Sequence, residues 1–245
     1  MTDSFFYQAA QNFRKFCCKL SLYREKYWLT QIYKKYISDN PRVADIQKIS
    51  LDDNLKILSG ERNFPLQTLY PAGWWRTMLL RYGLAMNFSK EKEVLETCSG
   101  LGWGGYLLDG VAKKVVCVEQ NEKAILAAKN LWKTKVTVYQ QGSVTELKAE
   151  DSSFDVVTAM ESLEHFSLND IKHYLREIYR VLKPGGILIG SSYFPETRAE
   201  ADKVCKENEY HKYVLTGKEL RELLSNLGFK SIKIFKNKLF FTAKK

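Results

Sequence analysis

Short apolar runs alternate with helix-like segments from residue 93 to the end of the chain. The runs have the length and composition of buried strands and cover residues 93–97, 115–119, 136–140, 154–160, 187–193, 231–235 and 239–243. Helical periodicity occupies residues from about 104 and 121–132, 168–182 and 217–226. This alternation predicts an α/β fold: a doubly wound, seven-stranded, mostly parallel sheet with helices on both faces. The last two runs are close enough in sequence to form an antiparallel hairpin.

The first 90 residues have a different pattern. An apolar stripe with a spacing of three and four runs through residues 4–37, at Phe6, Ala9, Phe13, Phe16, Leu20, Tyr23 and Tyr27. It predicts an amphipathic helix, broken once and ended by Asn40 and Pro41. The stripe suits packing on the core, a lid over a site, or peripheral contact with a membrane. A short helix is predicted over 75–86, so residues 1–90 are expected to form a helical cap and residues 91–245 the core.

The positive net charge of the chain indicates what type of partner it could bind. The formal charge of the 245-residue chain is +10, and residues 1–90 hold 14 Lys and Arg against 7 Asp and Glu. Such an excess favours an anionic partner, namely an acidic substrate, nucleic acid or an anionic membrane surface, although it also serves solubility. Five cysteines without a C-x-x-C spacing predict no disulfide framework and a reducing, cytoplasmic location. Neither a signal peptide nor a transmembrane segment is expected.

A glycine-rich stretch follows the first strand and begins a helix. Gly100, Gly102 and Gly105 satisfy G-x-G-x-x-G, and Glu119 ends the next strand. Glycines allow the backbone to approach a ligand closely, while a carboxylate at the second strand end can accept both hydroxyls of a ribose. Glu96 lies at the end of the first strand, where it would repel a pyrophosphate but suit a cationic amino group. The stretch therefore predicts a nucleoside-containing cofactor with a cationic end.

Five ordered motifs in residues 70–245 together resemble the class I S-adenosylmethionine (SAM) dependent methyltransferases. They are "VLETCSGLG", "VCVEQN", "QGSV", "FDVVTAMESLEH" and "RVLKPGGILI". The resemblance implies the Rossmann-like methyltransferase fold and SAM as cofactor. It also implies that "LKPGG" is a structural turn into the fifth strand.

The resemblance assigns cofactor-binding roles residue by residue. It implies that the methionine end is held by Glu96, Cys98, Gly100 and Gly102, that Glu119 binds the ribose, and that the adenine is bordered by Gln120, Gly142, Ser143 and Val144, with Met160 at the fourth strand end. Arg76 is expected to pair with the SAM carboxylate, with Arg81 as the alternative. Tyr70, Trp74 and Trp75 are candidates for the wall of the acceptor pocket or for ordinary core packing.

Two positions depart from the family pattern. Cys98 stands where members usually have glycine, and Ser143 stands where they usually have aspartate. A cysteine narrows the methionine pocket, whereas a serine can bond adenine but adds no charge. These departures keep open a non-catalytic SAM-binding module as an alternative.

Three titratable groups cluster in "MESLEHF", after the fourth strand. Its MExxEH pattern looks most like the ubiquinone-type O-methyltransferases and is similar to the small-RNA 2'-O-methyltransferases. That resemblance implies a divalent cation such as Mg²⁺ held by Glu161, Glu164, His165 and a distant histidine, for which His211 is the candidate. The alternative is a metal-free site in which the histidine acts as base; Glu164, His165 and His211 are the predicted catalytic residues. His173 is expected to lie on the surface.

The leading expectation is an O-methyltransferase acting on a small molecule, for which the basic charge favours an anionic acceptor. An oxygen acceptor must lose its proton, which a histidine or a metal ion can assist. An RNA 2'-O-methyltransferase is the second hypothesis, supported by the basic N-terminal third. No recognisable RNA-binding module supports it further.

Overall fold

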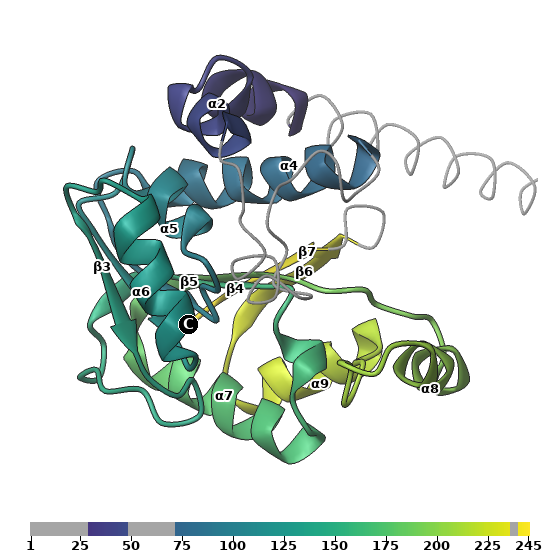
Figure 1. Ribbon diagram of the computed structural model, residues 1–245. Coiled ribbons are helices and arrows are strands. Elements are labelled where there is room, and N and C mark those ends of the chain that lie inside the picture. Colours follow the sequence, from purple (N-terminus) through teal and green to yellow (C-terminus); the bar gives the residue numbers. More distant parts are fainter. Residues whose placement is uncertain (1–28, 49–71, 236–239) are drawn as a thin grey trace, which may run out of the picture.

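The computed structural model describes residues 29–48, 72–235 and 240–245, with side chains omitted at 47–48 and 72–76 (Figure 1). Most of the helix predicted over 4–37 lies outside these residues, as does Tyr70. Residues 29–33 are helical and continue into a π-helical turn, η1 (Lys34–Ser38). Helix α2 (Pro41–Lys48) follows at once, so Asn40 and Pro41 separate two helices. A proline at a first helical position loses no hydrogen bond, because that amide has no partner within the helix.

Seven strands form one sheet in the order β3-β2-β1-β4-β5-β7-β6. Their bounds are β1 (Glu93–Thr97), β2 (Lys114–Glu119), β3 (Thr137–Gln141), β4 (Phe154–Met160), β5 (Leu182–Ser191), β6 (Lys230–Phe235) and β7 (Phe240–Lys244). The first five are parallel, and β7 runs antiparallel to both β5 and β6. The predicted doubly wound sheet with a closing antiparallel hairpin is confirmed.

Helices cover both faces of the sheet, and the strand residues alternate between two cores. On one face Val94 and Val156 pack with α4 (Ala72–Ser89), α5 (Trp103–Leu108) and α6 (Glu122–Leu131). On the other face Leu95 and Val157 pack with α7 (Leu168–Val181) and α9 (Gly217–Asn226). Figure 1 shows α2 and α4 stacked above the sheet and α7 and α9 below it. Both faces are therefore apolar, as expected for parallel strands.

Two helices were not predicted from the apolar pattern, α2 and α8 (Arg198–Glu207). Helix α8 buries only Ala201, so its sequence has no apolar stripe to detect. It is nevertheless marked by a capping box, in which Thr197 and Glu200 each accept from the other's backbone amide. Local capping therefore identifies this helix better than hydrophobic periodicity does. Among the described residues, no helix has the length and apolar character required to cross a membrane.

Strand β5 begins five residues earlier than the predicted run 187–193 and ends at Ser191. Pairing with β4 starts at Leu182, is interrupted, and resumes at Ile187. The "LKPGG" segment that was expected to be a turn is therefore an irregularity inside the strand. Gly185 allows it, because this residue has a φ of +77°, which disfavours a side chain.

The described part of residues 1–90 shares its core with the sheet. Arg42 of α2 forms a 2.7 Å ion pair with Asp109 just after α5 and donates to the Tyr106 carbonyl at 2.7 Å. The other Asp109 oxygen accepts from the amides of Lys135 and Val136. One buried carboxylate thus joins the N-terminal helices, α5 and the start of β3. The predicted boundary between residues 1–90 and 91–245 stays a prediction.

Replacing Asp109 by alanine is expected to destabilise the protein strongly. The change leaves two backbone amides and the Arg42 guanidinium without this acceptor, in a place where the Asp109 side chain is 0% exposed. We expect the free energy of unfolding in urea to fall by about 3 kcal/mol. The Asp151 side chain is 76% exposed, so the control Asp151→Ala should change the free energy by less than about 0.5 kcal/mol. Equal effects of the two variants would contradict this account.

Candidate active site

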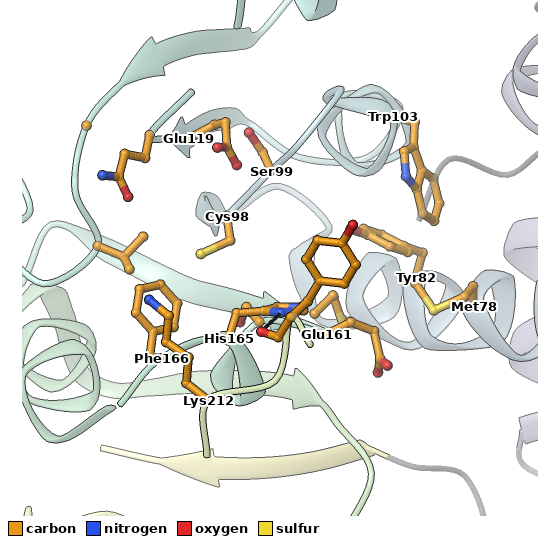
Figure 2. A pocket seen from close by; sticks show the side chains of 16 residues that line it. Met78, Tyr82, Cys98, Ser99, Trp103, Glu119, Glu161, His165, Phe166 and Lys212 are labelled. Atoms are coloured by element: carbon orange, nitrogen blue, oxygen red, sulfur yellow. Dashed lines mark hydrogen bonds between the residues drawn. The ribbon is translucent and has the colours of Figure 1, made fainter. Parts of the chain in front are cut away.

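A cavity of about 430 Å³ opens at the carboxyl ends of β1, β2 and β4. Eight of the predicted site residues line it: Cys98, Glu119, Gln120, Gly142, Val144, Met160, Glu161 and His165. Figure 2 shows Cys98, Ser99 and Glu119 on one side, and Met78, Tyr82 and Trp103 on the other. Strand order reverses between β1 and β4, which is where open α/β sheets bind ligands.

The turn after β1 uses left-handed backbone at three positions. Cys98, Gly100 and Gly102 have φ angles of +52°, +53° and +75°. Cys98 therefore adopts a conformation that favours glycine, which is the residue the family usually has there. A Cβ on Gly102 would lie 2.5 Å from the Tyr139 ring and 2.7 Å from Ala128. Gly102 thus serves close packing at the start of α5, and neither it nor Gly100 lines the cavity.

Glu119 presents a fixed carboxylate at the end of β2. One oxygen accepts from the Gly100 amide at 3.1 Å and the other from the Asn121 amide at 2.9 Å. The residue is 7% exposed and borders the cavity. Each carboxylate oxygen has a further lone pair, so a pair of vicinal hydroxyls can still be bound. The arrangement suits the predicted ribose contact.

Glu96 lies behind the cavity wall and does not line it. Its carboxylate accepts from Tyr82 Oη at 2.5 Å and from Cys117 Sγ at 3.4 Å. Burial raises the pKa of Glu96 to about 7, against the effect of these two hydrogen bonds. The predicted direct contact with the methionine end is therefore not the arrangement observed. Tyr82 lies at the wall instead and joins Glu96 to the cavity.

The predicted adenine edge is only partly brought to the cavity. Gln120, Gly142 and Val144 line it, whereas Ser143 faces solvent and pairs its hydroxyl with Thr145 Oγ1 at 2.8 Å. The expectation that Ser143 borders adenine is not met in this arrangement. Arg76 belongs to α4, and its side chain is outside the described part of the structure, as are those of Trp74 and Trp75.

Glu161 is separated from the rest of the predicted metal cluster. Its carboxylate forms a 2.5 Å ion pair with Arg81, which is 1% exposed and comes from α4. Figure 2 shows the Glu161 side chain extending away from His165. Arg81 thus already has a carboxylate partner, and its expected pairing with a SAM carboxylate stays a prediction. The backbone of Glu161 has a φ of +45°, a strained value of the kind found at functional sites.

Glu164, His165 and His211 do come together. They can offer ligand atoms that all lie within 4.8 Å of one another, and the two imidazole rings are 5.5 Å apart. The chain after α8 is held here because the Glu164 carbonyl accepts from the amides of Lys212 and Tyr213. The Glu164 side chain is buried, and burial with the nearby Glu161 charge raises the pKa of this carboxyl well above its usual range. His211 is thus correctly predicted to lie beside Glu164 and His165, although it is 46 residues from His165 in sequence.

The contacts of His165 determine its tautomer. Nδ1 lies 3.2 Å from the Tyr210 carbonyl oxygen. A carbonyl can only accept, so Nδ1 carries the hydrogen and Nε2 of the neutral ring carries a lone pair. His165 lines the cavity and can therefore accept a proton from a bound molecule.

The fold agrees with comparisons to known proteins. Residues 95–190 match the family model described as a methyltransferase domain. The described residues have the fold of the SAM-dependent methyltransferases. A SAM-dependent methyltransferase from Archaeoglobus fulgidus has the same fold, with a TM-score of 0.60 and 17% identity over 79% of this chain and 100% of that one.

Two mycobacterial relatives extend the match over more of the chain. The chain is 30% identical over 174 residues to a probable SAM-dependent methyltransferase of Mycolicibacterium smegmatis, and 31% over 172 residues to one of Mycobacterium tuberculosis. Each alignment covers 70% of this chain, but only 65% and 61% of the respective relatives. The nearer resemblance to ubiquinone-type enzymes stays a prediction.

Several residues that line the cavity were missed from the sequence. Met78, Tyr82 and Trp103 come from α4 and α5, whereas Phe166, Tyr210 and Lys212 come from connections. The first group belongs to apolar helical patterns that equally indicate core packing. The second carries one signal, because Tyr210 and Lys212 flank His211 in sequence.

Loss of Glu161, the partner of Arg81, should destabilise the protein. Glu161→Leu leaves a fully buried guanidinium without its carboxylate, and we expect a loss of about 3 kcal/mol in unfolding free energy. Urea unfolding measures it, with Glu222→Leu as control because that side chain is 60% exposed. The double variant Arg81→Met/Glu161→Leu should recover much of the loss. Failure of the double variant to recover any stability would show that the charge is not the cause.

Proposed function

We propose that the protein transfers a methyl group from SAM to an oxygen atom of a small molecule. The observation that carries the proposal is that Glu119 and His165 line one cavity at the switch point of the sheet. Glu119 suits the ribose of the cofactor, and His165 suits the acceptor. A cavity of about 430 Å³ lies in the range of small-molecule sites.

The chemistry follows from this placement. The acceptor oxygen attacks the methyl carbon as the bond from that carbon to the sulfonium sulfur breaks, so the products are a methyl ether and S-adenosylhomocysteine. The acceptor proton moves to His165 Nε2, since Nδ1–H is held by the Tyr210 carbonyl. Such a base typically contributes about 10²–10⁴-fold to rate. Alignment of the two substrates supplies much of the remaining acceleration.

An RNA acceptor is the second candidate for the same reaction. It rests on the charge excess in residues 1–90, most of which lies outside the described residues. The cavity favours a small acceptor, because its described walls combine aromatic residues, namely Tyr82, Trp103 and Phe166, with the single cation Lys212. Retention of RNA at low salt, lost steeply as salt rises, would favour RNA instead.

A divalent cation is the alternative to His165 as a free base. Glu164, His165 and His211 fit it, because the Glu164 Oε2 atom is buried without a hydrogen-bond partner among the described residues and faces borderline nitrogen ligands. A bound ion would take the Nε2 lone pair of His165 and would itself lower the pKa of the acceptor, so His165 would act as the base only in the metal-free site. Glu161 is not included, since it pairs with Arg81.

Cofactor binding tests the core of the proposal. Calorimetry with S-adenosylhomocysteine should show binding, weakened at least about tenfold in Glu119→Ala because two ribose hydrogen bonds are lost. Glu122→Ala, an exposed glutamate three residues later, should bind normally. Methyl transfer from labelled SAM to a panel of phenols and hydroxy acids should fall about 10²-fold in His165→Ala with unchanged cofactor affinity. No binding by the unaltered protein would refute the proposal, while binding with no turnover on any acceptor would favour a non-catalytic module.

Chelation tests the cation separately. We expect Mn²⁺ to bind the purified protein in calorimetry and His211→Ala to weaken that binding at least about tenfold. Turnover should fall in EDTA and return with added Mg²⁺ or Mn²⁺. His173→Ala is the control, since this histidine is exposed on α7, as predicted. Full turnover in EDTA, with no Mn²⁺ binding, would leave His165 as a metal-free base.

A further inference from the structure

Tyr174 of α7 places its phenol group beside the carboxyl ends of β1 and β4, two neighbouring strands in the middle of the sheet. Its side chain is completely buried, and its hydroxyl contacts Thr97 Oγ1 at the end of β1. The same oxygen lies 3.2 Å from Ser162 Oγ and 4.0 Å from Cys98 Sγ. The last residue of β1 and one residue from each of two turns therefore meet one hydroxyl group.

The direction of each hydrogen bond can be derived. Thr97 Oγ1 lies 2.6 Å from the Thr158 carbonyl oxygen, which can only accept, so the Thr97 hydroxyl donates there. Tyr174 must then donate to Thr97, and the phenol oxygen accepts from Ser162 and, more weakly, from the Cys98 thiol. Burial raises the pKa of Tyr174 well above its usual value, which keeps this donor protonated. Each of the three hydroxyl groups and the thiol thus donates its hydrogen to one acceptor.

The cluster begins where the sheet stops joining these strands. The last paired residues of β1 and β4 are Thr97 and Ala159. Beyond them, Cys98 lies in the turn on the cofactor side, and Ser162 lies in the turn that carries the acceptor-side residues. Both line the cavity, and both contact the phenol. The phenol is therefore a hydrogen-bonded cross-link that joins the two turns beyond the point where the strand pairing ends.

We propose that Tyr174 is a positioning residue that sets the separation of the cofactor and acceptor turns. The proposal rests on the proposed function, because methyl transfer requires sulfur, methyl carbon and acceptor oxygen in line. Tyr174 does not line the cavity and acts through Cys98 and Ser162, which do. Without its hydroxyl, the two turns keep their residues but lose their common anchor.

Tyr174→Phe tests the cross-link without any ligand. The ring stays, so the core should stay packed, whereas the Cys98 turn loses its anchor. We expect alkylation of Cys98 by iodoacetamide, followed by peptide mass spectrometry, to accelerate about three- to tenfold. Half-buried Cys205 is the internal control. Tyr179→Phe is the matched variant, because Tyr179 is on the same helix but packs against Phe229. An unchanged Cys98 rate in Tyr174→Phe, at a temperature where the variant is folded, would overturn the proposal.

A second variant and a second readout separate this proposal from the proposed function. Ser162→Ala should accelerate Cys98 alkylation less, and should add nothing in the Tyr174→Phe background, because the serine acts through the phenol. Tyr174→Phe should also lower kcat about tenfold while changing the KM for SAM less than about threefold. A purely structural role predicts a lower Tm with kcat unchanged. If the unaltered protein binds no S-adenosylhomocysteine, the proposed function fails, and the alkylation rates still decide whether the cross-link exists.

Discussion

The parallel pairing of β1 with β4 is the constraint on which the site depends. It aligns Thr97 with Ala159, so that β1 and β4 end at the same level of the sheet. The chain then continues from β1 toward β2 and from β4 toward β5, on opposite sides of this pair. One turn then carries Cys98 and the glycines, and the other carries Glu161 to His165. Neither turn has an apolar pattern of its own. The two turns lie close together because β1 and β4 are hydrogen-bonded to each other. Alternate side chains of these strands pack in the two cores, which holds the strands in place.

Three carboxylates around the cavity each have a partner, and these contacts limit what remains for chemistry. Glu161 pairs with Arg81, Glu96 accepts from Tyr82, and Glu119 accepts from two backbone amides. An unpaired buried charge would cost several kcal/mol, so these contacts are required once the residues are buried. The groups left to face a ligand are the outer lone pairs of Glu119 and the Nε2 side of His165. In the proposed reaction, the polar groups of the cavity are thus divided between a cofactor side at Glu119 and an acceptor side at His165.

Much of the fold and part of the site could be predicted from the sequence. Residues 93–97, 154–160 and 217–226 have the same bounds in the prediction and in the structure, because strong apolar patterns and clear ends coincide there. Helix α8 and the irregular start of β5 were missed, since a surface helix has no stripe and a proline–glycine pair resembles a turn. In the site, the structure brings Glu119 and His165 to one cavity and His211 beside His165. Glu96 lies behind the wall, Ser143 faces solvent and Glu161 pairs with Arg81, because the direction of a side chain depends on neighbours from other elements.

The sequence by itself determined the order of strands and helices, the glycine turn and the residue types at the strand ends. Periodicity and turn chemistry act over a few residues, so they can be read locally. Only the tertiary structure decided which carboxylates face the cavity, because Arg81 and Tyr82 reach Glu161 and Glu96 from a helix that precedes the sheet. It likewise brought Tyr174 under Thr97, Cys98 and Ser162. Such contacts join residues far apart in the chain, and no local pattern records them.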